Sequence, residues 1–197
     1  MPRNKDQFDE MRLQTINKLK QAGLKLFAKK GLAATNIKEI AREAQVSLGL
    51  IYHYYPSKED LYLSLANEAM EKSQGVADQL NRLESSIRDK ICLFIDAFLH
   101  GVQKEDGIYY FIIISQSFET GKRDEDQQLL EKKLQSIRNL AALVQQGQER
   151  GECAEGDPFQ LASTFISATQ GIASFKLMFG EQFTLPDKEI LIRILLK

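Results

Sequence analysis

The 197-residue sequence predicts an all-α fold in two parts, a small N-terminal domain over residues 1–56 and a larger helical domain over residues 57–197. Two observations predict this fold. Apolar residues recur at three- and four-residue spacing along most of the chain, which is the period of an amphipathic helix. Ser, Asp and Asn precede several of these segments, and Gly or Pro follows them, as at helix starts and stops. We find no internal repeat and no low-complexity linker.

The first helix is expected over about residues 9–30, where Gly31 would end it. One face of this helix is apolar and should pack over the next two helices. Its members are Leu13, Ile16, Leu19, Gly23, Leu26 and Phe27.

Two short helical patterns follow, joined only by Gln45, Val46 and Ser47. The first pattern has a single apolar stripe, formed by Ile37, Ile40, Ala41 and Ala44. Asn36 directly before this helix and Glu39 within it form a capping-box pattern. Ser47 can cap the second helix, which Pro56 stops. So short a connection forces a steep crossing, as in a helix-turn-helix, whose second helix enters the major groove of DNA.

An aromatic cluster and then Pro, Ser, Lys and an acidic residue end this segment, reading Tyr52, His53, Tyr54, Tyr55, Pro56, Ser57, Lys58 and Glu59. The pattern resembles the hallmark of the TetR family of bacterial transcription regulators, and the resemblance covers roughly residues 12–65. Beyond residue 70 only the length and the helical layout are similar. The resemblance implies a homodimer that binds a palindromic operator in double-stranded DNA, usually as a repressor, and is released by a small-molecule effector in the C-terminal domain.

By motif position, the resemblance implies DNA contacts at Asn36, Ser47, Leu48, Gly49, Leu50, Tyr52, His53 and Lys58. Small Gly49 would let the helix backbone approach the duplex, while Ser47, Tyr52 and His53 can each donate a hydrogen bond to phosphate. Lys58, in the first turn of the next helix, would bind phosphate together with free backbone N–H groups. The alternative for Lys58 is that neighbouring acidic residues simply offset its charge.

Three positions depart from the family's pattern. Many relatives have Lys in place of Leu48 and Thr in place of Leu50, and an exposed Leu can read bases only through apolar contact, most naturally a thymine methyl. We therefore predict a thymine-rich half-site, the alternative being that Leu48 and Leu50 pack against neighbouring helices. Gln45 stands where relatives usually have Gly, and a positive φ there would cost roughly 1–2 kcal/mol.

The C-terminal helices are expected from Ser57 onward, from Ser85 or Ser86 to about Gln103, over about residues 124–150 and 157–179, and after Pro186. The run Ile108–Ile114 is apolar and rich in β-branched residues, so periodicity alone allows strand or helix. We expect a helix because every neighbouring segment is helical.

The resemblance implies an apolar effector pocket between the helix that follows Ser57 and its neighbours. Aromatic residues of this domain could form its wall, although ordinary core packing also explains such residues. The candidates are Phe94, Phe98, Tyr110, Phe111, Phe118, Phe165 and Phe175. Scarce charge in residues 108–118 indicates an apolar or neutral ligand. The resemblance implies dimerisation through residues 124–150 and 157–179, and small side chains there would permit close helix contact. They are Ala162, Ser163, Ala168, Gly171, Ala173 and Ser174.

Composition argues against other classes of protein. The net charge is −1, but residues 1–60 carry 11 basic and 7 acidic side chains, so the positive charge gathers in the half with the DNA-binding motif. Cys92 and Cys153 lack metal-binding spacing, and with only His53 and His100 we expect no metal site and no cofactor. No catalytic constellation appears, so we expect no enzyme.

The N-terminus is too charged for a signal peptide, and no apolar run approaches the length of a membrane span, which predicts a cytoplasmic protein. The alternative function is a DNA-bound adaptor or activator whose C-terminal domain binds a protein partner.

Overall fold

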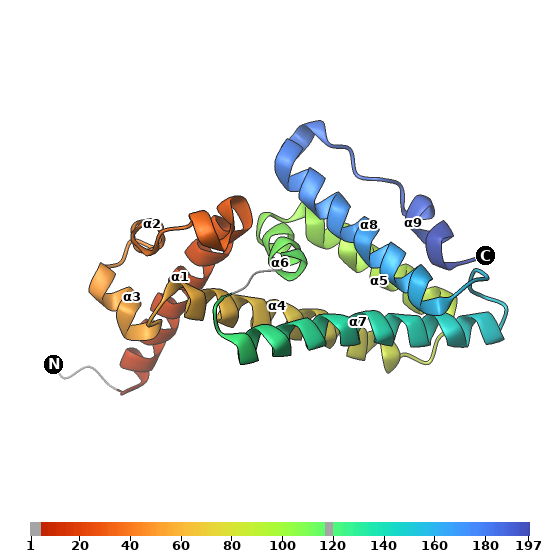
Figure 1. The fold of residues 1–197 in the computed structure, drawn as a ribbon, viewed down its shortest axis with the longest axis horizontal. Coiled ribbons are helices and arrows are strands. Elements are labelled where there is room, and N and C mark those ends of the chain that lie inside the picture. Colours follow the sequence, from red (N-terminus) through yellow and green to blue (C-terminus); the bar gives the residue numbers. More distant parts are fainter. Residues whose placement is uncertain (1–4, 117–119) are drawn as a thin grey trace.

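The computed structural model describes residues 5–116 and 120–197, and these residues form nine α-helices, one short 3-10 turn and no strand beyond an isolated bridge between Cys153 and Leu196 (Figure 1). The predicted all-α fold is confirmed. The helices are α1 (Lys5–Ala34), α2 (Ile37–Glu43), α3 (Leu48–Tyr54), α4 (Lys58–Asn81), α5 (Ile87–Gln103), α6 (Glu105–Ser115), α7 (Arg123–Glu149), α8 (Pro158–Phe179) and α9 (Lys188–Leu195).

The long α1 packs on α2 at one side and on α4 and α6 at the other (Figure 1). Gly31, the predicted stop, has a φ of 78° and interrupts the helical backbone, which resumes for one more turn. Residues 7–14 are exposed, so the prediction that Leu13 lies on the packed face is wrong, since its side chain is 60% exposed. Apolar residues at helical spacing show which face of a helix is apolar. They do not show where along that helix its neighbours stop covering this face.

The bridging helix α4 runs from the N-terminal helices into the C-terminal ones (Figure 1). It starts directly after the predicted boundary at residue 56, capped by Ser57, whose Oγ accepts a hydrogen bond from the Asp60 N–H at 3.1 Å. Gly23 of α1 lies so close to α4 that an added Cβ would come within 2.9 Å of Leu61. A larger residue at position 23 would therefore have to displace the Leu61 side chain at this crossing.

The C-terminal part consists of α4 to α9. α7 and α8 pack against each other, closest where α7 ends and α8 begins, and α9 packs against α5 and α8 (Figure 1). The ambiguous run Ile108–Ile114 is helical, as expected, and forms the body of α6. Ile108, Tyr109, Ile112 and Ile113 of α6 are buried, which explains why this helix carries so few polar residues.

Candidate functional site

The helix α3 is anchored on one side and open on the other. Ser47 caps it by accepting the Leu50 N–H at 3.2 Å, and the fully buried Ile51 fixes it to the core. Leu48 and Tyr52 are 36% and 48% exposed on the outer surface. This arrangement is that of a helix whose outer face is available to a partner.

The other predicted contact residues of α3 fall on the same open surface or at its edge. An added Cβ on Gly49 would meet no atom within 4 Å, so this position is open to a close approach. His53 is exposed, with its ring 5.0 Å from the ring of Tyr54, and Leu50 is half-buried. Tyr54 and Tyr55 pack against the core.

The sequence singled out two backbone features around α2, the capping box before it and the turn that follows it. The predicted capping box is present, because the Asn36 Oδ1 accepts the Lys38 N–H at 2.9 Å and the Glu39 carboxylate accepts the Asn36 N–H at 3.5 Å. Gln45 has a φ of 57°, in the left-handed region that favours glycine. Gln therefore holds a strained turn conformation.

Ion pairs join α1 to α2. Lys30 lies 3.0 Å from Glu39 and Lys25 lies 2.6 Å from Glu43, counted between nitrogen and carboxylate oxygen. These hydrogen-bonded lysines hold the pKa of both carboxyl groups below its ordinary value. Part of the positive charge of the N-terminal half is thus neutralised internally.

Lys58 has partners within the chain. Its ammonium donates to the carbonyl oxygens of Leu32, Ala33 and Thr35 at 2.8, 3.2 and 3.0 Å. The side chain therefore ties the start of α4 to the end of α1, a role that sequence reasoning missed. A phosphate contact at Lys58 stays a prediction.

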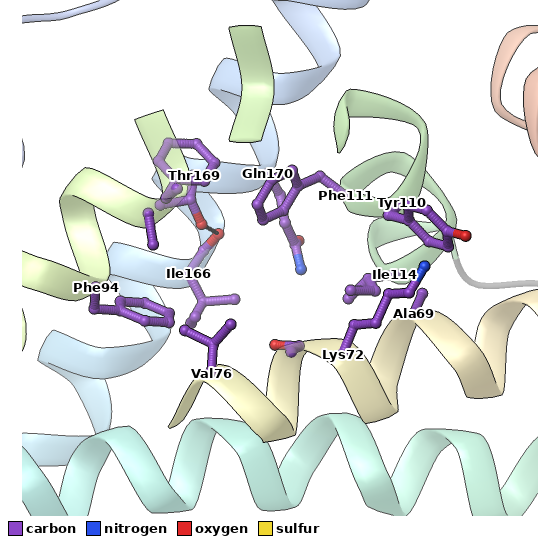
Figure 2. A pocket seen from close by; sticks show the side chains of 13 residues that line it. Ala69, Lys72, Val76, Phe94, Tyr110, Phe111, Ile114, Ile166, Thr169 and Gln170 are labelled. Carbon is purple, nitrogen blue, oxygen red and sulfur yellow. Dashed lines mark hydrogen bonds between the residues drawn. The ribbon is translucent and has the colours of Figure 1, made fainter. Parts of the chain in front are cut away.

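A cavity of about 200 Å³ lies among α4, α5, α6 and α8 (Figure 2). Four of the seven predicted aromatic residues line it, namely Phe94, Phe98, Tyr110 and Phe111. The structure does not bring the others to it: Phe165 is fully buried beside Phe94, and Phe175 is 50% exposed. Phe118 lies outside the described residues.

Much of the remaining wall comes from residues of α4 and α8 that sequence reasoning did not name. The contributors are Ala69, Lys72, Ser73, Val76, Ile166, Thr169 and Gln170. On α4 they follow the i, i+3, i+4, i+7 spacing of one helix face. A lysine and a serine on an otherwise small and apolar face were the sequence signal that could have located this wall.

A second, smaller cavity of about 80 Å³ adjoins the first and shares Ser73, Phe94 and Ile166 with it. It continues along α4 toward Leu80 and Lys90. The two cavities therefore lie next to each other along α4, and the smaller one has the more polar wall.

A charged cluster lies at the opposite end of the larger cavity, centred on Glu68 of α4. Its carboxylate accepts hydrogen bonds from Lys20 of α1 at 2.7 Å and from the Tyr110 hydroxyl of α6 at 2.8 Å, and it pairs with Lys72 at 2.9 Å. Burial alone would raise the pKa of Glu68, but these three partners outweigh it and lower that pKa to about 2. The carboxylate is therefore ionised and connects α1, α4 and α6.

Within the described residues, no group of three or more His, Cys, Asp or Glu side chains is placed to hold a metal ion. None of the helices in residues 5–116 and 120–197 combines the length and the apolar character needed to cross a membrane.

The fold and this site define a helix-turn-helix protein with a larger helical part that contains an apolar cavity. Residues 19–65 match the family model described as bacterial regulatory proteins, tetR family. These residues therefore form a DNA-binding domain of the TetR family.

Individual relatives agree with this assignment. The HTH-type transcriptional regulator HbdR of Aromatoleum sp. (strain CIB) is 37% identical over 91 residues, which cover 46% of this chain and 38% of HbdR. The chain thus spans well under half the length of that relative.

Two solved structures share the fold over nearly the whole chain. The MbdR regulator from Azoarcus sp. CIB has a TM-score of 0.76 at 24% identity, covering 91% of this chain and 96% of MbdR. FadR from Bacillus subtilis, solved in complex with stearoyl-CoA, has a TM-score of 0.65 at 18% identity, covering 93% of this chain and 95% of FadR. At these identities the likeness concerns the fold alone.

Proposed function

We propose that this protein is a transcriptional repressor that binds a palindromic operator as a homodimer and leaves it when a small-molecule effector binds. One observation carries the proposal: α4 joins a helix-turn-helix, whose second helix has an open outer surface, to an apolar cavity in the same chain. The regulators named above support the DNA-binding half, and the stearoyl-CoA bound to FadR supports a ligand in the helical part.

The proposed DNA surface consists of Asn36, Ser47, Leu48, Gly49, Leu50, Tyr52, His53 and Lys58. The exposure of Leu48 supports apolar readout of thymine methyl groups, since its side chain is 36% exposed at the start of α3. The hydroxyl of Tyr52 and the imidazole of His53 would position the helix through phosphate contacts.

The homodimer would form through α7 and α8 as a four-helix bundle across a two-fold axis. Ala162 and Ala173 are fully buried within the chain and serve its own core. Ser163, Ala168, Gly171 and Ser174 are only half-buried, which supports their availability to a second copy.

Effector binding would act through α4, whose first turn holds the end of α1 and whose middle lines the cavity. A shift of α4 would move the two α3 helices of a dimer out of register with successive major grooves. A coupling free energy of about 1–3 kcal/mol, typical of allostery, would change operator affinity roughly 5- to 150-fold.

The second candidate is a DNA-bound adaptor or activator whose C-terminal part binds another protein. The observation that favours it is a cluster of exposed apolar side chains at the end of α8, where Phe175, Met178 and Phe179 are 50%, 70% and 48% exposed. This candidate predicts DNA binding that no small molecule alters.

The test is selection of bound duplexes from a random-sequence pool with purified protein at near-physiological salt, followed by sequencing. We expect a palindromic consensus with thymine in each half-site. The Leu48→Ala variant should select the same palindrome with a weaker thymine preference, because only the apolar contact is removed. A pool without enrichment would reject sequence-specific binding, and a half-site of G·C pairs alone would reject the readout by Leu48.

A further inference from the structure

The cavity has one charged end. Within the residues that the structure describes, Lys72 is the one charged side chain that lines the larger space. It belongs to the cluster of Lys20, Glu68 and Lys72, which holds two positive charges and one negative charge. The cluster therefore has a surplus positive charge where it meets the cavity.

Lys72 can move away from Glu68 without leaving that carboxylate unpaired. Its ammonium lies 3.8 Å from the centre of the Tyr110 ring, and its side chain is 56% exposed, so the ammonium can turn at little cost. If it left Glu68, that carboxylate would keep its hydrogen bonds from Lys20 and Tyr110.

The rest of the cavity suits an apolar body. Figure 2 shows Lys72 and Tyr110 at one end and Phe94, Val76 and Ile166 toward the other. The smaller cavity shares Ser73, Phe94 and Ile166 with this one, so a ligand that occupied both spaces would be extended. In the larger cavity, a bound molecule would have its anionic end at Lys72, because among the described residues this is the one charged side chain of that wall.

We propose that the effector is an elongated apolar molecule with a single anionic end, such as a carboxylate, and that this end pairs with Lys72 in place of Glu68. The inference rests on the proposed function, because it assigns a ligand class to the effector cavity. It refines the sequence-based expectation of an apolar or neutral ligand by adding one negative charge at a defined end.

The test compares decanoate with 1-decanol, which have the same chain and differ in charge, by calorimetric titration of the full-length protein below their aggregation concentrations. We expect decanoate to bind roughly tenfold more tightly, as for a charged hydrogen bond weakened by partial exposure to solvent. Equal affinity for the two compounds would overturn the proposal, and so would the binding of neither.

Two variants should shift this preference in opposite directions. Lys72→Met should abolish the preference for decanoate while 1-decanol still binds. Glu68→Gln should increase it, by roughly threefold, because Lys72 then has no competing carboxylate. A merely structural role of the cluster would weaken the binding of both compounds in both variants, and that result would overturn the proposal.

Two further lysine-to-methionine variants remove the same charge elsewhere and test where the anionic end of the ligand binds. Lys132→Met removes an exposed lysine of α7 that does not line the larger cavity, and it should leave the preference unchanged. Lys90→Met removes the lysine of the smaller cavity, and loss of the preference in this variant alone would place the anion at the wrong end. Operator selection on the same protein separates the outcomes, because DNA binding can persist when the ligand inference fails.

Discussion

At the scale of the residue, two residues near α3, the helix proposed to read DNA, have an unusual backbone conformation or unusual hydrogen-bond partners. Gln45 adopts a positive φ in the turn before α3, and the Lys58 ammonium satisfies three carbonyl groups at the end of α1. Both features fix how α3 is presented relative to α1 and α4. A substitution at either position would therefore affect the presentation of α3 even if neither side chain touches DNA.

The strain at Gln45 can be measured. Gln45→Gly should stabilise the protein by about 0.5–1 kcal/mol, because relief of the left-handed conformation exceeds the entropy cost of a flexible glycine. The control Gln21→Gly lies on the exposed side of α1, within the helix, and should destabilise by about 1 kcal/mol. Urea unfolding measures both free energies. A destabilised Gln45→Gly variant would show that the turn carries no net strain.

At the scale of the element, the Glu68 cluster holds three helices together. Lys20 reaches it from α1, Lys72 from the next turn of α4, and Tyr110 from α6. Because α1 belongs to the N-terminal part and α6 lines the cavity, any change at this carboxylate acts on both.

The stabilisation by Glu68 should depend on pH. Its folded-state pKa of about 2 lies below the ordinary value of 4.5, so the stabilisation is complete above pH 4.5 and is lost as the pH falls toward 2. Wild type should exceed Glu68→Gln in unfolding free energy by about 1 kcal/mol at pH 7, allowing for solvent screening, and by progressively less below pH 4.5.

Unfolding in urea between pH 7 and pH 3 measures this difference, with Glu71→Gln as the control at an exposed carboxylate of the same helix. The control should leave stability nearly unchanged at pH 7. If the difference in unfolding free energy between wild type and Glu68→Gln stayed constant from pH 7 to pH 3, this result would contradict the lowered pKa of Glu68.

At the scale of the whole molecule, the proposal that two copies pair through α7 and α8 can be tested at Gly171. Gly171 of α8 is half-buried, and a Cβ added to it would meet no atom of the chain within 4 Å. A side chain placed there fits the monomer but would push a second copy away.

Gly171→Leu should therefore weaken the dimer about tenfold or more, because a bulky side chain prevents close helix contact across the two-fold axis. Sedimentation at a series of concentrations measures the dissociation constant. Gly75→Leu, at an exposed glycine of α4 with equally open surroundings, should leave the dimer intact. Unchanged sedimentation of Gly171→Leu would exclude this face, and operator affinity should fall in parallel with dimerisation.

The sequence by itself determined the helices, their caps and the helix-turn-helix, because these features depend on residues a few positions apart. Asn36 and Ser47 cap the helices that they were expected to cap, and Ser57 and Asp157 cap the helices that were expected to begin beside them. Even the ambiguous run in α6 followed from its helical neighbours.

The tertiary structure alone decided which side chains meet across helices. Periodicity could not show that α1 extends past its neighbours at Leu13, that Phe175 lies outside the cavity, or that Lys58 holds the end of α1. It also could not bring Lys20, Glu68 and Tyr110 together, because they come from three helices. Contacts between distant segments depend on crossing angles and helix lengths, and local spacing does not encode these.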